Sequence, residues 1–200
     1  MKFSSKEIKD LFIAWLMISI AFAILLSGGL GAFLSLNVFI ISLAISGLTV
    51  GIGFLFHELM HKFMAQKYHL WAEFRAFYKM LWLAILFSLF GFIIAAPGGV
   101  MIKGNLNRER NGKISLAGPL TNIVLALLFL VLLLSINATG ILGLFFSYGL
   151  TINALLAAFN MIPFPPFDGH KIYQWNKGIY FITAILAVGL FLSRFIYNIP

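Results

Sequence analysis

The residues best suited to chemistry lie in the stretch Phe56-His57-Glu58-Leu59-Met60-His61, at the end of an apolar run that begins near Asn37. Side chains four residues apart project from the same face of a helix, so His57 and His61 can hold one zinc ion between them. Glu58 can then reach a water molecule beside the ion. Charged residues also follow apolar spans simply because they lie among lipid headgroups. A further ligand is therefore needed to decide between the two interpretations.

The segment from Asn160 to Gly169 offers that ligand. It has prolines at positions 163, 165 and 166, which prevent a regular helix and let the chain turn inward. Asp168, together with two neutral imidazoles, would leave the fourth position of a zinc ion open for water, as a catalytic site requires. Pro-Phe-Asp-Gly is also a common turn sequence, so the prediction depends on Asp168 emerging on the same side of the membrane as the histidines. The chain has no cysteine, which leaves His, Asp and Glu as its metal ligands.

The composition is that of an integral membrane protein. Hydrophobic residues make up 62% of the 200 residues and charged residues only 10%, a ratio that a soluble domain cannot hide in its core. The net charge of +8 comes from basic residues that flank the apolar runs. We therefore interpret them as topology signals and contacts with anionic lipid, and we expect the lipid bilayer, not nucleic acid, as a partner.

The apolar runs predict an all-α polytopic helical bundle. Five runs are long enough to cross a membrane, and the second helix is expected to continue through the histidines to about Lys67. A sixth segment, Met80–Ala96, is marginal and ends in Pro97-Gly98-Gly99. Short β segments are expected near residues 70–79 and 97–104. The five spans are Leu11–Leu26, Asn37–Phe56, Ile114–Leu134, Ile141–Phe159 and Gly178–Phe195. We expect one membrane domain over residues 1–200, with a catalytic core at about 37–170.

The distribution of basic residues distinguishes two topologies for the sixth segment. If residues 80–96 cross fully, Lys and Arg divide into eight inside and six outside; if they enter and return, thirteen lie inside and only Arg194 outside. The positive-inside rule favours the second arrangement, which also places the aromatic side chains of Trp71, Tyr78, Tyr173 and Trp175 in one interfacial belt. The sequence therefore predicts five full spans plus a re-entrant segment, with the N-terminus and the site toward the cytoplasm at the cell membrane.

Three motifs, in this order, resemble the site-2 protease family of intramembrane zinc metalloproteases. They are Phe56 to His61, Ala117-Gly118-Pro119-Leu120-Thr121-Asn122, and Asn160-x-x-Pro163 through Asp168-Gly169. Pro97-Gly98-Gly99-Val100 is similar to a glycine-containing segment of that family, and Phe167 stands where many members have leucine. The match covers about Asn37 to Gly169, and the chain resembles a minimal core without PDZ or other accessory domains.

The resemblance implies one zinc ion per chain, bound by His57, His61 and Asp168, with Glu58 as general base and Asn160 assisting at the reacting carbonyl. It also implies single-span membrane proteins as substrates. Glu58 would accept the proton of the attacking water while zinc polarises the scissile carbonyl. Two alternatives remain: a catalytically silent relative that binds membrane helices, and a metal or proton transporter. A transporter is expected to distribute ionisable groups through several spans, whereas 114–134 and 141–159 carry almost none.

Several other residues keep two interpretations. Asn160 is either a hydrogen-bond donor to the oxyanion or a structural amide at a helix end, and Asn122 serves either packing or support of the site. His69 and His170 are interpreted as interfacial or supporting groups, not as ligands. Gly47 and Gly51 form a pair suited to close helix packing. After Gly98-Gly99, Val100 to Lys103 can offer a strand edge to an unwound substrate.

Overall fold

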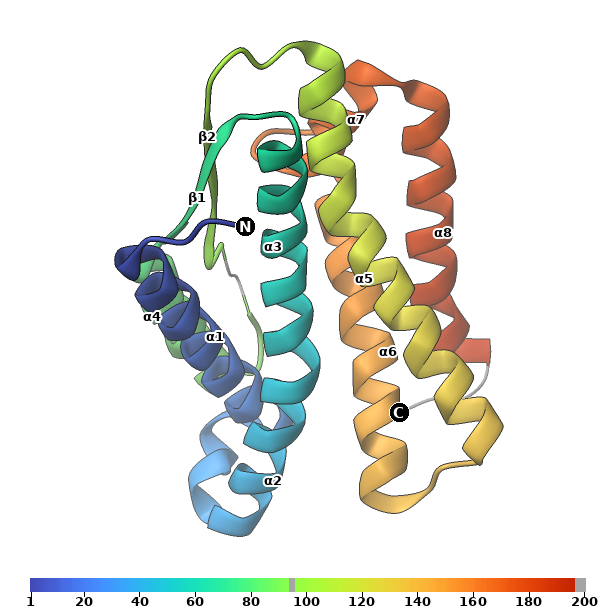
Figure 1. Ribbon diagram of the computed structural model, residues 1–200. Helices are drawn as coiled ribbons and strands as arrows, with labels where there is room; N and C mark the ends of the chain where they lie inside the picture. Colours follow the sequence, from blue (N-terminus) through green and yellow to red (C-terminus); the bar gives the residue numbers. More distant parts are fainter. Residues whose placement is uncertain (94–95, 197–200) are drawn as a thin grey trace. The chain divides into compact units, whose positions relative to one another are not determined.

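The computed structural model describes residues 1–93 and 96–196, without the side chains of residues 32–34 and 196. Helices dominate these ranges, and a sheet of two strands lies between them in the sequence (Figure 1). In chain order the elements are α1 (Ser5–Leu26), η1 (Gly29–Leu34), α2 (Leu36–Ser46), η2 (Gly47–Gly51), α3 (Ile52–Lys67), β1 (Trp71–Ala76), α4 (Tyr78–Leu89), β2 (Gly98–Lys103), α5 (Arg108–Ile136), α6 (Gly140–Asn160), α7 (Asp168–Trp175) and α8 (Lys177–Ile196).

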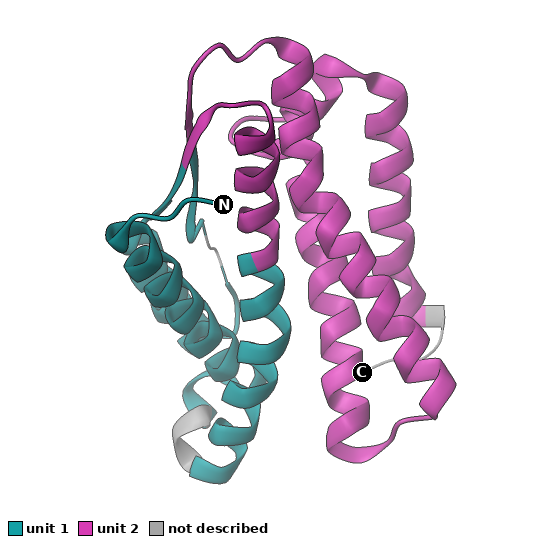
Figure 2. Ribbon diagram, viewed as in Figure 1, with its two compact units in different colours: residues 1–55, 73–101 teal, residues 56–72, 102–200 magenta. Residues whose placement is uncertain are grey.

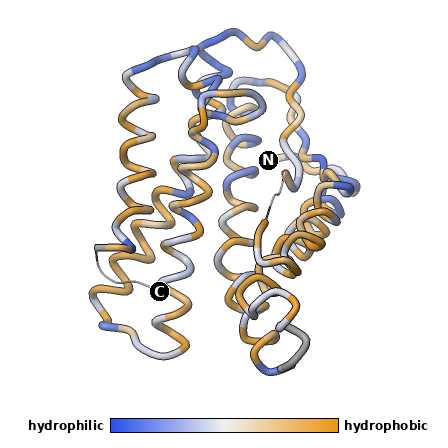
Figure 3. Tube along the Cα trace, turned by 180° about the vertical axis from the view of Figure 1, so that it is seen from behind, coloured by the Kyte–Doolittle hydropathy of each residue, from blue (hydrophilic) through white to orange (hydrophobic). Residues whose placement is uncertain are grey.

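The five predicted membrane-spanning helices are present. They are α1, the continuous helix Leu36–Lys67, α5, α6 and α8, all long and apolar enough to cross a membrane. Figure 3 shows hydrophobic residues along most of their length and hydrophilic residues gathered near the helix ends and loops. The protein is thus a multi-pass membrane protein with the predicted all-α architecture.

Helix α4 occupies most of the sixth apolar segment. Its 12 residues extend only ~18 Å at the α-helical rise, well short of the ~30 Å hydrocarbon core of a bilayer. The length of α4 agrees with a segment that enters the membrane without crossing it. Residues 94–95, near the end of the predicted segment 80–96, lie outside the described residues.

The chain divides into two compact units, coloured separately in Figure 2. Unit 1 comprises residues 1–55 and 73–101, where α1 packs against α2, η2 and α4. The Trp15 indole of α1 donates a hydrogen bond to the Gly47 carbonyl at 3.1 Å. A Cβ on Gly51 would lie 2.6 Å from the Ser19 hydroxyl and 2.7 Å from the Trp15 indole nitrogen. The prediction that Gly47 and Gly51 serve close helix packing is therefore confirmed.

Acidic side chains of α1 cover one edge of β1 within unit 1. Glu7 accepts a hydrogen bond from the backbone N–H of Phe74 at 2.9 Å, and Asp10 accepts from that of Ala76 at 3.3 Å. Glu7 and Asp10 are one helical turn apart, which matches the alternation of N–H groups along a strand edge. The predicted β segments are confirmed, and β1 has β2 on its other side.

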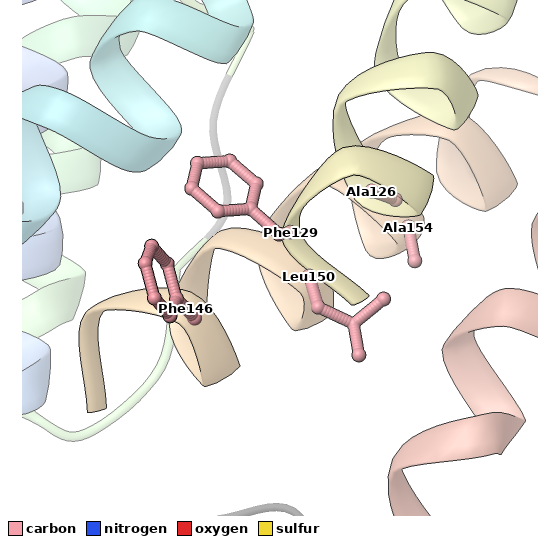
Figure 4. Close-up of a cluster of buried hydrophobic side chains, with 5 residues drawn as sticks. All are labelled: Ala126, Phe129, Phe146, Leu150 and Ala154. Atoms are coloured by element: carbon pink, nitrogen blue, oxygen red, sulfur yellow. The ribbon is translucent and has the colours of Figure 1, made fainter. Parts of the chain in front are cut away.

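Unit 2 comprises residues 56–72 and 102–200, and its core lies between α5, α6 and α8. Figure 4 shows one cluster of buried side chains shared by α5 and α6, formed by Ala126, Phe129, Phe146, Leu150 and Ala154. A Cβ on Gly149 would lie 2.5 Å from the Phe129 ring, so the glycine allows the ring to approach the α6 backbone. This packing fixes which faces of α5 and α6 meet.

Helix α5 begins six residues before the predicted span at Ile114. Asn107 is its N-cap and accepts a hydrogen bond from the backbone N–H of Arg110 at 2.8 Å. Capping extends a helix into polar sequence that hydropathy alone assigns to a loop. The segment that carries Arg108, Arg110 and Lys113 is thus helical.

Helix α7 is a short element that follows the three prolines. The chain from 161 to 167 is irregular, as predicted, and the helix starts at Asp168. Ile172 of α7 is fully buried in a cluster with Met161 and Tyr180. This cluster anchors α7 between the end of α6 and the start of α8, and so fixes the backbone that carries Asp168.

Candidate metal centre

Three side chains of unit 2 converge on one point. His57 and His61 project from α3 one turn apart, with their ring planes at 85° and ring centres 4.6 Å apart. The Nε2 atoms of His57 and His61 lie 3.3 Å and 2.9 Å from the same Oδ2 atom of Asp168. All three side chains are buried, and their nearest ligand atoms lie within 4.8 Å of one another, a group that can hold a metal ion.

The other ring nitrogen of each histidine already has a hydrogen-bond partner. His61 Nδ1 lies 2.8 Å from the backbone carbonyl oxygen of Ile114, and His57 Nδ1 lies 2.6 Å from Oδ1 of Asn122. A carbonyl oxygen only accepts, so His61 must carry a proton on Nδ1, which leaves Nε2 as the nitrogen that can offer its lone pair to a metal ion. Hydrogen bonding to the distal nitrogen is the usual way in which a protein orients a histidine ligand.

Asp168 is oriented by its position at the start of α7. Its Oδ2 faces the imidazoles, and its Oδ1 lies 3.5 Å from the ammonium group of Lys171. Burial raises the pKa of the Asp168 carboxyl, but in the metal-free site the imidazoles of His61 and His57, when protonated, outweigh burial and hold that pKa well below its usual range. The carboxyl is therefore ionised near neutral pH, as a metal ligand must be.

Two glycines make room for this group. A Cβ on Gly118 of α5 would lie 2.5 Å from Nε2 of His57 and of His61 alike. A Cβ on Gly169 would lie 2.3 Å from the backbone oxygen of Met161. Any side chain at 118 would therefore collide with both Nε2 atoms. The set of two imidazoles and one carboxylate fits a zinc ion with three protein ligands.

The two predicted catalytic residues have different surroundings. Glu58 lies on α3 beside His57 and is 8% exposed. Asn160, half-buried at the end of α6, donates from Nδ2 to the backbone carbonyl of Leu156 at 2.9 Å. This bond is the structural one expected of an amide at a helix end. The roles of Glu58 as base and Asn160 as oxyanion donor remain predictions.

The remaining histidines lie apart from the group. His69 is exposed just after α3, with a positive φ of 59°. His170 points its ring nitrogens toward the Pro163 carbonyl, at 3.3 Å, and the Gln174 amide, at 2.9 Å. Neither belongs to the candidate metal ligands found among the described residues.

Asn122 and Asn153 complete the surroundings of His57. The contact with His57 shows that Asn122 supports the site, one of the two roles left open by the sequence. Asn122 Nδ2 in turn donates to Oδ1 of Asn153 at 3.1 Å, and sequence reasoning missed Asn153. The signal available was a lone amide inside an apolar span, where a polar side chain needs a partner.

Fold and site together define a multi-pass helical membrane protein with a buried His-His-Asp group suited to a metal ion. Over 193 residues the chain is 45% identical to a protein of Methanocaldococcus jannaschii named "Putative zinc metalloprotease MJ0611", covering 96% of this chain and 95% of the relative. The chain therefore belongs to the same family of zinc metalloproteases.

Two further relatives match over shorter stretches. "Putative zinc metalloprotease YwhC" of Bacillus subtilis is 36% identical over 70 residues, 30% of this chain and 32% of that protein. "Zinc metalloprotease MJ0392" of Methanocaldococcus jannaschii is 31% identical over 120 residues, 59% of this chain and 30% of that protein. No protein-family model matches the chain, and no solved structure matches it significantly.

Proposed function

We propose that this protein is an intramembrane zinc metalloprotease of the site-2 protease type, which hydrolyses peptide bonds in the membrane spans of single-span proteins. The observation that carries the proposal is the convergence of two Nε2 atoms and one carboxylate oxygen in a unit built from apolar helices. The zinc metalloproteases to which the chain is similar support zinc as the metal. Burial of the three ligands supports reaction at the depth of the membrane.

His57, His61 and Asp168 would hold the zinc ion. When bound, zinc lowers the pKa of a water molecule and polarises a carbonyl group. Glu58 takes the proton from the water that attacks the peptide carbonyl, and it returns a proton to the departing amine. Glu58 is only 8% exposed, which keeps bulk water away from the proton that it takes up.

Asn160 would donate to the oxygen of the reacting carbonyl as negative charge develops there. In the structure its amide donates to its own helix at Leu156. The catalytic role therefore requires the amide to turn away from that carbonyl when substrate binds. Position supports this role: Asn160 ends α6, eight residues before Asp168.

A helical substrate must unwind before its peptide bonds can be attacked, and β2 offers a strand edge to the unwound segment. The two-stranded sheet of the described residues has β1 on one side of β2. Because α1 covers the far edge of β1, the unpaired edge of β2 is where a substrate strand would add. Proline at Met101 or Ile102 should reduce cleavage, and full activity of both variants would exclude pairing there.

The N-terminus and the site would face the cytoplasm of the cell membrane. Thirteen of the fourteen Lys and Arg residues then lie inside, as the positive-inside rule favours. Aromatic residues of the predicted interfacial belt lie near basic side chains in unit 2, which supports a shared headgroup position. The pairs are Trp71 with Lys103, Trp175 with Lys113, and Tyr173 with Lys177.

The decisive experiment reconstitutes purified, zinc-loaded protein with a panel of single-span helices and compares it with Glu58→Gln. We expect native protein to cut within a membrane span and the variant to be slower by at least ~10²-fold. Zinc content, measured in both proteins, should stay equal, because Glu58 is not a ligand. Equal product from both proteins would remove Glu58 from the mechanism. Zinc-bound native protein that cuts no helix in the panel would favour the catalytically silent relative.

A further inference from the structure

A chain of hydrogen bonds runs from the metal centre into the interior of α6. His57 Nδ1 lies 2.6 Å from Asn122 Oδ1, Asn122 Nδ2 donates to Asn153 Oδ1 at 3.1 Å, and Asn153 Nδ2 donates to the Gly149 carbonyl at 2.9 Å. Both asparagines are completely buried. This series of hydrogen bonds joins α3, α5 and α6 through the side chains of Asn122 and Asn153, which the proposed reaction does not use.

The last acceptor of this chain fixes the direction of every bond in it. A backbone carbonyl cannot donate, so Asn153 must turn its Nδ2 toward Gly149 and its Oδ1 toward Asn122. Asn122 must then turn its own Nδ2 toward Asn153, which leaves Oδ1 facing the imidazole. An oxygen in that position requires a proton on His57 Nδ1.

If both asparagine amides took the opposite orientation, the contact with the Gly149 carbonyl would be unfavourable. If His57 carried its proton on Nε2, Nδ1 would need a donor, and Asn122 would have to present Nδ2. Asn122 would then point oxygen at Asn153, Asn153 would present Nδ2 in return, and its own oxygen would face the Gly149 carbonyl. Two acceptors would then lie at hydrogen-bond distance in a buried site, an arrangement that costs the full desolvation of both groups.

We infer that Asn122 and Asn153 are positioning residues that hold His57 in the tautomer protonated on Nδ1, which leaves Nε2 to bind the metal beside Asp168. This inference rests on the proposed role of His57 as a ligand. The two histidines reach the same state by different routes. His61 bonds directly to the Ile114 backbone carbonyl, whereas His57 reaches its backbone carbonyl through two side-chain amides.

Because of this difference, a substitution at Asn153 can change the tautomer of His57. Asn153 reaches the histidine through Asn122, and it determines which atom Asn122 presents to the imidazole. Asn153→Leu removes that constraint, because leucine fills a similar volume without an acceptor. Asn153→Asp preserves it in the neutral form of the carboxyl, which burial away from charged groups favours: its O–H donates to Gly149 while its carbonyl oxygen accepts from Asn122.

The first test measures the tautomer in the full-length, metal-free protein in detergent micelles, at an alkaline pH where the imidazoles are neutral. Nitrogen-15 NMR of labelled histidine distinguishes the two neutral forms, and the four histidines are assigned by single substitution. We expect native protein, Asn153→Asp and the control Thr151→Val to hold His57 on Nδ1–H. Asn153→Leu should show a mixture. A native His57 protonated mainly on Nε2 overturns the inference without any variant.

The second test measures zinc affinity by competition with a chromogenic chelator. Loss of a residue that orients a ligand typically costs 10–100-fold in metal affinity, so Asn122→Leu should fall in that range and Asn153→Leu should lose several-fold to tenfold. Asn153→Asp and Thr151→Val should stay within about twofold of native. Thr151 is a suitable control because its buried hydroxyl lies on α6 and makes no hydrogen bond in the structure.

Equal zinc affinity of Asn153→Leu and Thr151→Val would overturn the inference, and so would equal losses in Asn153→Leu and Asn153→Asp. Neither measurement uses proteolysis. A protein that fails to cut helices yet shows the expected tautomer and affinities would contradict the proposed function alone.

Discussion

At the scale of single residues, a substitution at Gly118 should disturb the metal centre more than any other change outside the ligands. A Cβ there would lie 2.5 Å from both ligand nitrogens, and Gly118→Ala must therefore displace the imidazoles from Asp168. We expect zinc affinity to fall at least ~100-fold, with cleavage lost in proportion. Equilibrium dialysis against buffered zinc measures this loss.

Gly189→Ala is the matched control for Gly118→Ala. Gly189 also lies in a membrane-spanning helix, but nothing lies within 4 Å of the position of its Cβ. Alanine is the better helix former, so the control should fold and bind zinc as native protein does. Native-like zinc affinity of Gly118→Ala would show that the imidazoles can move aside. The close contact at Gly118 would then not limit zinc binding.

The sequence could predict the convergence of His57, His61 and Asp168, because helical spacing fixes the first pair and the topology argument places the third. It could not decide the role of Asn122, since that depends on how α5 is rotated about its axis. An almost uniformly apolar run contains little information about that rotation. Asn153 was missed for a related reason: its partners are another amide and a backbone carbonyl, neither of which leaves a motif.

At the scale of elements, Gly112 determines how closely α5 approaches α7. A Cβ there would lie 2.3 Å from Cβ of Trp175, at the end of the helix that begins with Asp168. Gly112→Ala should displace α7 at a cost of about 1–3 kcal/mol. We expect a lower melting temperature and a several-fold weaker zinc affinity, measured by thermal unfolding with and without zinc.

The melting temperature and the zinc affinity of Gly112→Ala report on different properties: the packing of α5 against α7, and the position of Asp168. If the melting temperature falls while zinc affinity stays native, α7 does not transmit the displacement to Asp168. If neither changes, the contact between Gly112 and Trp175 is looser in solution than in the structure. Gly118→Ala gives the contrasting case, because its side chain would meet the ligands themselves.

The secondary structure could be predicted where composition changes sharply. The five spans, the short α4 and the two strands follow from apolar runs and glycine or proline breaks. The early start of α5 did not, because Asn107 acts through a local cap that hydropathy does not register. The hydrogen bonds from β1 to Glu7 and Asp10 were also not predicted, because more than sixty residues separate these side chains from the strand.

At the scale of the whole molecule, the metal centre belongs to unit 2 alone. His57 and His61, Asp168, and the supporting amides of α5 and α6 all lie within residues 56–72 and 102–200. The contacts of Trp15 and of the acidic residues of α1 belong to unit 1. Each unit thus has its own polar contacts. Loss of the metal should therefore lower local stability more in unit 2 than in unit 1.

Hydrogen exchange with and without a chelator tests this inequality. A metal ion stabilises the state that binds it, so chelation should raise amide exchange about tenfold or more in segments 56–67 and 168–175, where local opening then becomes easier. Segments 5–26 and 78–89 should change less than about twofold. Chelator added to His61→Ala protein should have no effect, because the site is already broken. A uniform rise along the native chain would show instead that the two units unfold as one, and that the metal stabilises the whole molecule.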